Sequence, residues 1–193
     1  MLRIGYRSDE NEKPYDVKFE LKLPPKALGR LEKVNELVRK AVSHENAWLT
    51  VCIDHALDRG IYQCDMRFDR SDYSGDSVGY CGVSRADYAI PYPCQPVEFP
   101  RAVCYNDQGL LGNLKLHNGQ TIRMELNMNT GTLHFFIGGA QQRVFISGIN
   151  TPVKFFGSVF YTHSSFTILL LKRIFKPSAV PKTGERELKW VQS

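Results

Sequence analysis

A half-buried β-sheet is the structure that the alternation in residues 121–149 favours most strongly. Ile122, Met124, Leu126 and Met128 are separated by polar residues, so one face of an extended strand is apolar and the other polar. The alternation returns after a short polar turn, and a glycine pair then precedes another apolar run. Glycine and asparagine tolerate the positive φ of tight reversals. The segment therefore predicts a meander that is scaffold rather than catalytic machinery, with turns at Asn129-Thr130-Gly131 and Gly138-Gly139-Ala140.

Short apolar or alternating runs recur along most of the chain, with turn residues between them. Residues 89–100 carry four prolines and cannot form a central strand, because proline lacks the backbone N–H. Residues 165–174 are almost continuously apolar, which predicts a central strand. Many short strands with frequent turns indicate a β-sandwich rather than an α/β fold. The expected strands are 48–53, 60–68, 77–84, 114–116, 121–128, 133–137, 144–146, 153–160 and 165–174, and we expect Trp48, Phe135, Phe155 and Ile168 to be buried.

One segment before these strands has helical spacing. Apolar residues recur every three or four positions through residues 26–42, and charged residues occupy the intervening positions. This pattern predicts one N-terminal amphipathic helix that packs on the sandwich of its own chain. Its apolar stripe consists of Leu28, Leu31, Val34, Val38 and Val42.

These patterns divide the chain into three parts. Residues 1–46 form an extension that contains the helix, residues 47–175 form the sandwich, and residues 176–193 form a linker-like basic tail that extends away from it.

The net charge of +5 lies at the ends of the chain. Residues 1–40 carry 10 Lys/Arg and 7 Asp/Glu (+3), residues 41–170 carry 9 and 11 (−2), and residues 171–193 carry 6 and 2 (+4). A nucleic-acid-binding domain is expected to gather its basic residues on the folded surface. We therefore expect solvated termini, and any contact with nucleic acid only through them.

Motifs for catalysis, metals and cofactors lack their usual context. Gly75-Asp76-Ser77-Val78-Gly79 matches G-x-S-x-G, but the required strand before the serine and helix after it are missing. The five histidines are far apart, and the acidic residues from Asp65 to Asp76 lack the order of a calcium loop. We predict a protein that is not an enzyme and that needs no metal or cofactor.

The chain shows no secretory signal and no apolar run long enough to span a bilayer. Five cysteines without a CxxC pair indicate reduced thiols. Both features favour an intracellular protein, cytoplasmic or nuclear, that does not associate with membranes.

Three strand motifs resemble the SPRY-domain family. They are Gly60-Ile61-Tyr62-Gln63-Cys64-Asp65-Met66, Val78-Gly79-Tyr80-Cys81-Gly82-Val83 and the hairpin Leu126-Asn127-Met128-Asn129-Thr130-Gly131-Thr132-Leu133-His134-Phe135-Phe136. Asn127 stands where the family usually has Asp, and Gln63 where it more often has Glu. The resemblance covers about residues 48–173. It implies two antiparallel sheets of jelly-roll type and a non-enzymatic protein-binding module.

In such a sandwich the loops vary while the strands stay packed, so recognition falls to the loops. We expect a shallow surface, built by loops at one end, that accepts a short peptide or a partner protein. Tyr and Arg commonly anchor interfaces. The candidate partner-binding residues are Asp69, Arg70, Asp72, Tyr73, Arg85, Asp87, Tyr88, Tyr92, Tyr161 and His163.

The main hypothesis is therefore an adaptor-like binding module, mainly β, with one N-terminal helix. The alternative is a structural subunit of a large ribonucleoprotein or cytoskeletal assembly that docks through the sandwich and the basic tail. A lectin is a third reading, because related sandwiches bind sugars, and the lack of a secretory signal disfavours it.

Overall fold

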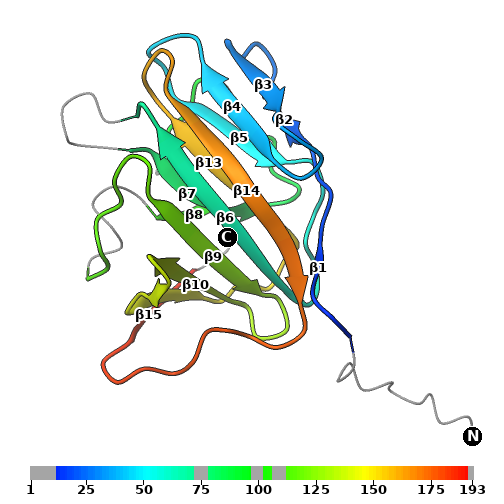
Figure 1. Cartoon of the computed structure of the whole chain (residues 1–193), viewed down its shortest axis with the longest axis vertical. Coiled ribbons are helices and arrows are strands. Elements are labelled where there is room, and N and C mark those ends of the chain that lie inside the picture. Colours follow the sequence, from blue (N-terminus) through cyan, green and yellow to red (C-terminus); the bar gives the residue numbers. More distant parts are fainter. Residues whose placement is uncertain (1–11, 72–77, 97–101, 106–111, 191–193) are drawn as a thin grey trace, which may run out of the picture.

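The computed structural model describes residues 12–71, 78–96, 102–105 and 112–190, and about half of these residues lie in two β-sheets that share one hydrophobic core (Figure 1). The prediction of a mainly β, two-sheet sandwich is confirmed.

Among the described residues, the larger sheet has ten strands. They are β1 (Tyr15–Asp16), β3 (Gly29–Lys33), β4 (Arg39–Ser43), β6 (Ile61–Asp69), β9 (Thr121–Asn127), β10 (Thr132–Ile137), β11 (Ala140–Gln141), β12 (Val144–Ser147), β14 (Ser165–Ile174) and β15 (Arg186–Lys189). Their order is β15-β12-β10-β9-β6-β14-β4-β3, with β1 beside β14 and β11 beside β10. The pairing of β12 with β15 is parallel, whereas the other pairs of described strands are antiparallel.

The smaller sheet has five strands in the order β2-β5-β13-β7-β8, all antiparallel. They are β2 (Leu21–Lys22), β5 (Leu49–Ile53), β7 (Tyr80–Arg85), β8 (Ala102–Tyr105) and β13 (Val153–Val159). Eight of the nine expected strands are present, as β5, β6, β7, β9, β10, β12, β13 and β14. The expected strand at residues 114–116 is wrong, since these residues are not extended in a ladder.

The core fills the space between the two sheets. Phe135 of β10 is fully buried, and its ring centroid lies 5.0 Å from that of Tyr105 in the opposite sheet. Phe155 and Ile168 are also fully buried, as predicted. Trp48 is only half-buried, because it precedes β5 at the end of the sandwich rather than lying within it.

The central position predicted for residues 165–174 is confirmed, because β14 lies between β6 and β4. Its pairing with β6 shifts between Ile168 and Leu170. A bulge adds one residue and reverses which side chains face the core. Phe166 and Ile168 are therefore buried before the bulge, and Leu171 after it.

The predicted helix over residues 26–42 is wrong, because this segment forms the β3–β4 hairpin. The backbone N–H of Val34 donates to the carbonyl of Val38 at 3.1 Å. Between them, Oδ1 of Asn35 accepts hydrogen bonds from the N–H groups of Leu37 and Val38, at 2.8 and 3.0 Å. An asparagine side chain that bonds the following backbone in this way stabilises a turn.

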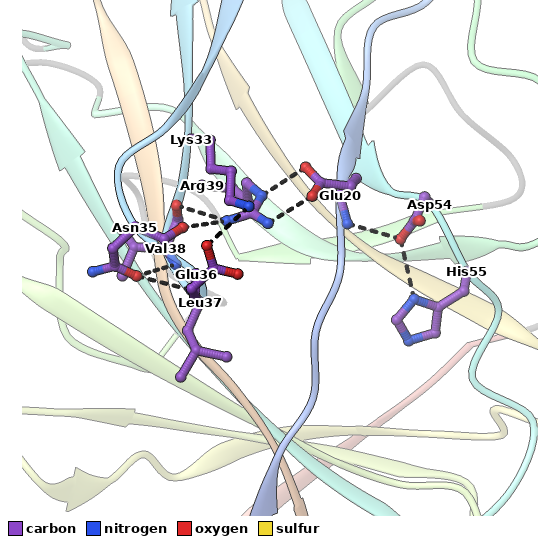
Figure 2. A network of polar contacts seen from close by, with 9 residues as sticks. All are labelled: Glu20, Lys33, Asn35, Glu36, Leu37, Val38, Arg39, Asp54 and His55. Atoms are coloured by element: carbon purple, nitrogen blue, oxygen red, sulfur yellow. Dashed lines mark hydrogen bonds and ion pairs between the residues drawn. The ribbon is translucent and has the colours of Figure 1, made fainter.

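A polar network centred on Arg39 joins this hairpin to the rest of the molecule (Figure 2). Arg39 is 4% exposed, and its Nε and Nη2 donate to the two carboxylate oxygens of Glu20, each at 2.6 Å. Its Nη1 donates to the carbonyl of Asn35 at 2.7 Å. The N–H of Glu20 donates in turn to Oδ1 of Asp54 at 3.0 Å. One buried guanidinium thus ties together the hairpin, the chain before β2 and the chain after β5.

The expectation that the basic tail extends away from the sandwich is also wrong. The segment after β14, orange to red in Figure 1, turns back, and its strand β15 pairs with β12. The N–H of Trp190 donates to the carbonyl of Ser147 at 2.8 Å. The indole of Trp190 is 8% exposed and belongs to the core.

A buried carboxylate holds the start of this segment. Glu125 of β9 is 1% exposed and accepts hydrogen bonds from the N–H of Ser178 at 2.9 Å and from its hydroxyl at 2.6 Å. The N–H of Ala179 donates to the same carboxylate at 2.9 Å. The described residues of the extension and of the tail therefore belong to the same two sheets as residues 47–175.

We expect Trp190→Ala to destabilise the fold by about 3–5 kcal/mol, the range for truncating a large aromatic side chain in a core. Leu188→Ala is the matched control, because Leu188 lies two residues earlier, on β15, and is 38% exposed. Its cost should stay below about 1 kcal/mol. Urea unfolding measures the free energy of unfolding of both variants. If Trp190→Ala lost as little stability as Leu188→Ala, the Trp190 side chain would not contribute to the core.

The Arg39–Glu20 pair predicts a pH-dependent stability. The hydrogen bond from Arg39 lowers the pKa of the Glu20 carboxyl below its ordinary value of 4.5. A carboxyl group whose pKa is lower in the folded than in the unfolded chain stabilises the fold at pH values above the unfolded-state pKa. This stabilisation is lost as the pH falls through the folded-state pKa. We expect Glu20→Gln to be less stable than the wild type at neutral pH, with the difference shrinking below pH 4.5.

Asp58→Asn is the control for that experiment, because Asp58 and its partner Arg59 are largely exposed and 3.8 Å apart. Such surface pairs contribute little to stability. Denaturation across a pH series measures both differences. A Glu20→Gln deficit that stays constant down to pH 3 would contradict the assignment.

Candidate functional site

Successive antiparallel strands run in opposite directions, so the loops of this sandwich alternate between its two ends. β7 begins where β13 ends, since Tyr80 pairs with Ser158, and β7 ends where β13 begins, since Arg85 pairs with Val153. We call these the Trp48 end and the Tyr88 end, after one residue at each. Each end holds a surface pocket.

The pocket at the Trp48 end has a volume of about 270 Å³ and is largely aromatic. The ring centroid of Trp48 lies 5.0 Å from that of Tyr80 and 5.2 Å from that of Phe160. Phe160 meets Tyr161 edge to face at 5.2 Å. Trp48, Phe160 and Tyr161 are all half-buried, so each presents part of its ring to solvent. Ser71 and Gly79 complete the lining.

Backbone geometry fixes the other wall of this pocket. Gly79 has a φ of +118°, and a Cβ added there would lie 2.2 Å from the carbonyl oxygen of Ser158. Only glycine therefore allows the chain to enter β7 so close to β13. The N–H and hydroxyl of Ser71 both donate to Oδ1 of Asn118, at 3.2 and 2.8 Å. These contacts attach the chain after β6 to the turn before β9.

Four of the candidate binding residues lie at the Trp48 end. Tyr161 lines the pocket, Asp69 is the last residue of β6, and Arg70 follows it. Arg70 and His163 are exposed and have positive φ, 55° and 67°. The N–H of His163 donates to the carbonyl of Ser43 at 2.8 Å, which fixes its loop against β4. Asp72 and Tyr73 lie outside the described residues.

Three other candidates lie at the Tyr88 end. Arg85 ends β7 and donates to both carboxylate oxygens of Asp87, at 3.0 and 2.7 Å. Asp87 and Tyr88 line a pocket of about 340 Å³ that also contacts Lys154 and Cys52. Desolvation raises the pKa of the Cys52 thiol to about 11. A thiol that stays protonated at neutral pH is a poor nucleophile.

Tyr92 lies on the segment that connects the two ends, residues 86–96. The hydroxyl of Tyr92 donates to the carboxylate of Glu45, and desolvation raises the pKa of Tyr92 to about 12. Farther along, the hydroxyl of Thr50 donates to the carbonyl of Cys94 at 3.1 Å, and Gln95 Nε2 donates to the hydroxyl of Tyr80 at 2.6 Å. The segment therefore crosses the outer face of the smaller sheet, and Tyr92 lines neither end pocket.

Of the described candidates, four thus lie at the Trp48 end, three lie at the Tyr88 end and Tyr92 lies between them, so no single end holds them all. Of the aromatic residues that line the Trp48 pocket, sequence reasoning identifies Tyr161 and misses Phe160 and Trp48. The sequence pattern places Phe160 inside a strand and Trp48 in the core. The signal that could have identified both is their position at the boundary between a strand and a loop, where an aromatic ring can remain partly exposed.

Other kinds of site find no support in the part of the chain that the structure describes. It contains no cluster of three or more His, Cys, Asp or Glu side chains suited to a metal ion. Nor does it contain a helix that is long and apolar enough to cross a bilayer. Asp65, from the acidic series, forms a two-point ion pair with Arg123, at 2.7 and 2.8 Å. Ser77 of the G-x-S-x-G match lies outside the described residues.

Comparison with known proteins gives the fold a name. No family model matches the chain, and no curated protein matches its sequence. The SPRY domain of human HERC1 superposes with a TM-score of 0.54 at 14% identity, over 82% of this chain and 100% of that one. The TRIM65 PSpry domain gives 0.52 at 16% identity, over 77% and 89%. The lectin UEA-II, in complex with galactose, gives 0.50 at 9% identity, over 84% and 99%. The chain therefore has a SPRY-like fold.

Proposed function

We propose that this SPRY-like sandwich is a non-enzymatic protein-interaction module that binds a short peptide or an exposed loop of a partner protein in the Trp48 pocket. The observation that carries this proposal is the group of half-buried rings, Trp48, Phe160 and Tyr161, around an open pocket of about 270 Å³. The SPRY domains of similar fold are consistent with it.

The chemistry of the pocket fits an apolar anchor residue. Trp and Tyr are enriched among the residues that contribute most to binding, because they bury a large area and keep a polar group at one end. Arg70 and His163 are exposed at the same end, beside half-buried Asp69. An aromatic centre with a polar rim is the usual anatomy of a protein interface. We infer that an apolar side chain of the partner enters the pocket while polar groups of the partner meet the rim.

The alternative function, a structural subunit that docks through its basic tail, has less support. The described tail is held on its own sheet, and Lys182 Nζ donates to the carbonyl of Gln141 at 3.1 Å. A sugar-binding role rests only on the likeness to a lectin at 9% identity. We also propose an intracellular location, since the five cysteines are free thiols.

Peptides selected from a random display library against the full chain provide the test. We expect Trp48→Ala to weaken their binding about 30-fold or more, because truncating a central interface residue costs about 2 kcal/mol or more. Tyr161→Ala should weaken binding in the same direction. Fluorescence anisotropy with labelled peptides measures the dissociation constants.

Tyr88→Ala is the matched control, because it removes a half-buried tyrosine from the pocket at the opposite end. Its peptide affinity should equal that of the wild type, and thermal unfolding checks that each variant is folded. Peptides whose affinity falls with Tyr88→Ala and not with Trp48→Ala would place recognition at the Tyr88 end. A library that yields no binding peptide would contradict peptide recognition itself.

A further inference from the structure

Strand β3 is an open edge of the larger sheet. In the described part of the chain β3 pairs only with β4, and its register from Gly29 to Lys33 contains no bulge and no proline. The edge strand β2 of the smaller sheet, in contrast, is protected by its short length of two residues and by Pro24-Pro25, which follow shortly after it. Proteins usually protect edge strands by such devices, because an open edge can pair with another chain. β3 lacks both of these devices, and its remaining protection is the charge of Arg30, Glu32 and Lys33.

The hydrogen bonds of the hairpin show which backbone groups point outward. The carbonyl of Leu28 accepts from the N–H of His44, and the N–H of Val34 donates to the carbonyl of Val38, both at 3.1 Å. Even-numbered residues of the strand therefore direct their backbone groups toward β4. Since successive residues alternate, the N–H and C=O groups of Gly29, Leu31 and Lys33 point away from β4. These groups are the donors and acceptors of a free edge.

Apolar side chains accompany this edge. Leu28 is 55% exposed, Leu31 is 37% exposed and Val34 is 57% exposed. They lie on β3 or directly beside it, and exposed apolar side chains gathered along an open strand mark an association surface. Because the edge offers backbone hydrogen bonds and apolar area together, its partner should be another β-strand.

The sequence of the edge is complementary to itself. In an antiparallel pairing about Leu31, Arg30 faces Glu32 of the other strand and Leu28 faces Val34. The same register places Gly29 opposite Lys33, so that the outward-pointing backbone groups meet as hydrogen-bonded pairs. Opposite charges and apolar pairs across two strands are the favourable cross-strand combinations.

Neighbouring registers lose this match. Side-chain and backbone alternation allow only shifts that keep odd residues opposite odd residues. The nearest symmetric register on one side places Arg30 against Arg30 of the second strand. The nearest on the other side places Glu32 against Glu32, and like charges directly opposite are destabilising.

We propose that the partner of β3 is a second copy of this chain, paired antiparallel about Leu31 so that the two larger sheets become continuous across a two-fold axis. Such an interface is isologous, with the same surface used by both copies. It is separate from the Trp48 pocket, and peptide binding by that pocket does not depend on it.

Charge reversal tests both the edge and its register. Sedimentation velocity of the wild type should show, as concentration rises, a species of twice the chain mass of 22.0 kDa. Arg30→Glu and Glu32→Arg should each lose this species, because every cross-strand charge pair becomes repulsive. An equimolar mixture of the two variants should restore it, since glutamates at 30 and 32 in one chain then face arginines at 32 and 30 in the other.

Lys189→Glu is the matched control, as a charge reversal on β15, the edge strand at the other side of the same sheet. It should leave the doubled mass unchanged. The reversals at β3 remove exposed contacts, namely the Arg30–Glu32 pair at 2.6 Å and a contact of Arg30 Nη1 with His44 Nε2 at 3.4 Å, so circular dichroism should show folded variants. A wild type that stays monomeric at every concentration, a doubled mass that survives Arg30→Glu, or a mixture that stays monomeric would each overturn the proposal.

Discussion

The fold depends on covering the inner faces of its two sheets and most of the outer face of the smaller one. The inner faces pack on each other, and outward-pointing residues of the smaller sheet are buried as well. Phe156 and Ser158 alternate with core residues of β13, so they point outward, and both are 0% exposed. The hydroxyl of Ser158 finds a partner in Thr50 at 2.7 Å, as a buried hydroxyl requires. Segment 86–96 crosses this outer face, and the tail crosses that of the larger sheet through Glu125. The Trp48 pocket lies at one end of the sandwich, and β3 lies at an edge of the larger sheet.

The sheets were predictable from the sequence, and the segments outside residues 47–175 were not. Alternation fixes a strand when one face is buried, as in β9 and β10. The spacing of the 26–42 segment is ambiguous, because in a tight hairpin residues four apart, such as Val34 and Val38, face each other across the turn. Asn35 at a turn position was the missed signal. Glu125 reads from the sequence as a solvated strand residue, since its partners in the tail are 53 and 54 positions away.

The candidate site was predicted at the level of its loops but not of its assembly. Tyr161 and His163 lie beside the end of β6, because Ser165 at the start of β14 pairs with Asp69 at the end of β6. Arg85 ends β7 and Asp87 and Tyr88 follow it, one strand later than Asp69, so these residues emerge at the opposite end. Counting strands would have separated the two groups. It could not have placed Trp48 beside Phe160, because that contact depends on the pairing of β5 with β13 through Leu49 and Val159.

A dimer through β3 would set how the Trp48 pocket is presented. β3 begins at the Trp48 end, since Gly29 pairs with Ser43 and the N–H of Ser43 bonds to the loop before β14. Antiparallel pairing reverses the second copy, so its pocket faces the opposite direction along the strands. Two sites arranged in this way cannot both engage one short peptide, and avidity requires that both be reached at once. The dimer would instead hold two partner molecules on opposite sides, which makes it a bridge between partners rather than a tighter binder of one.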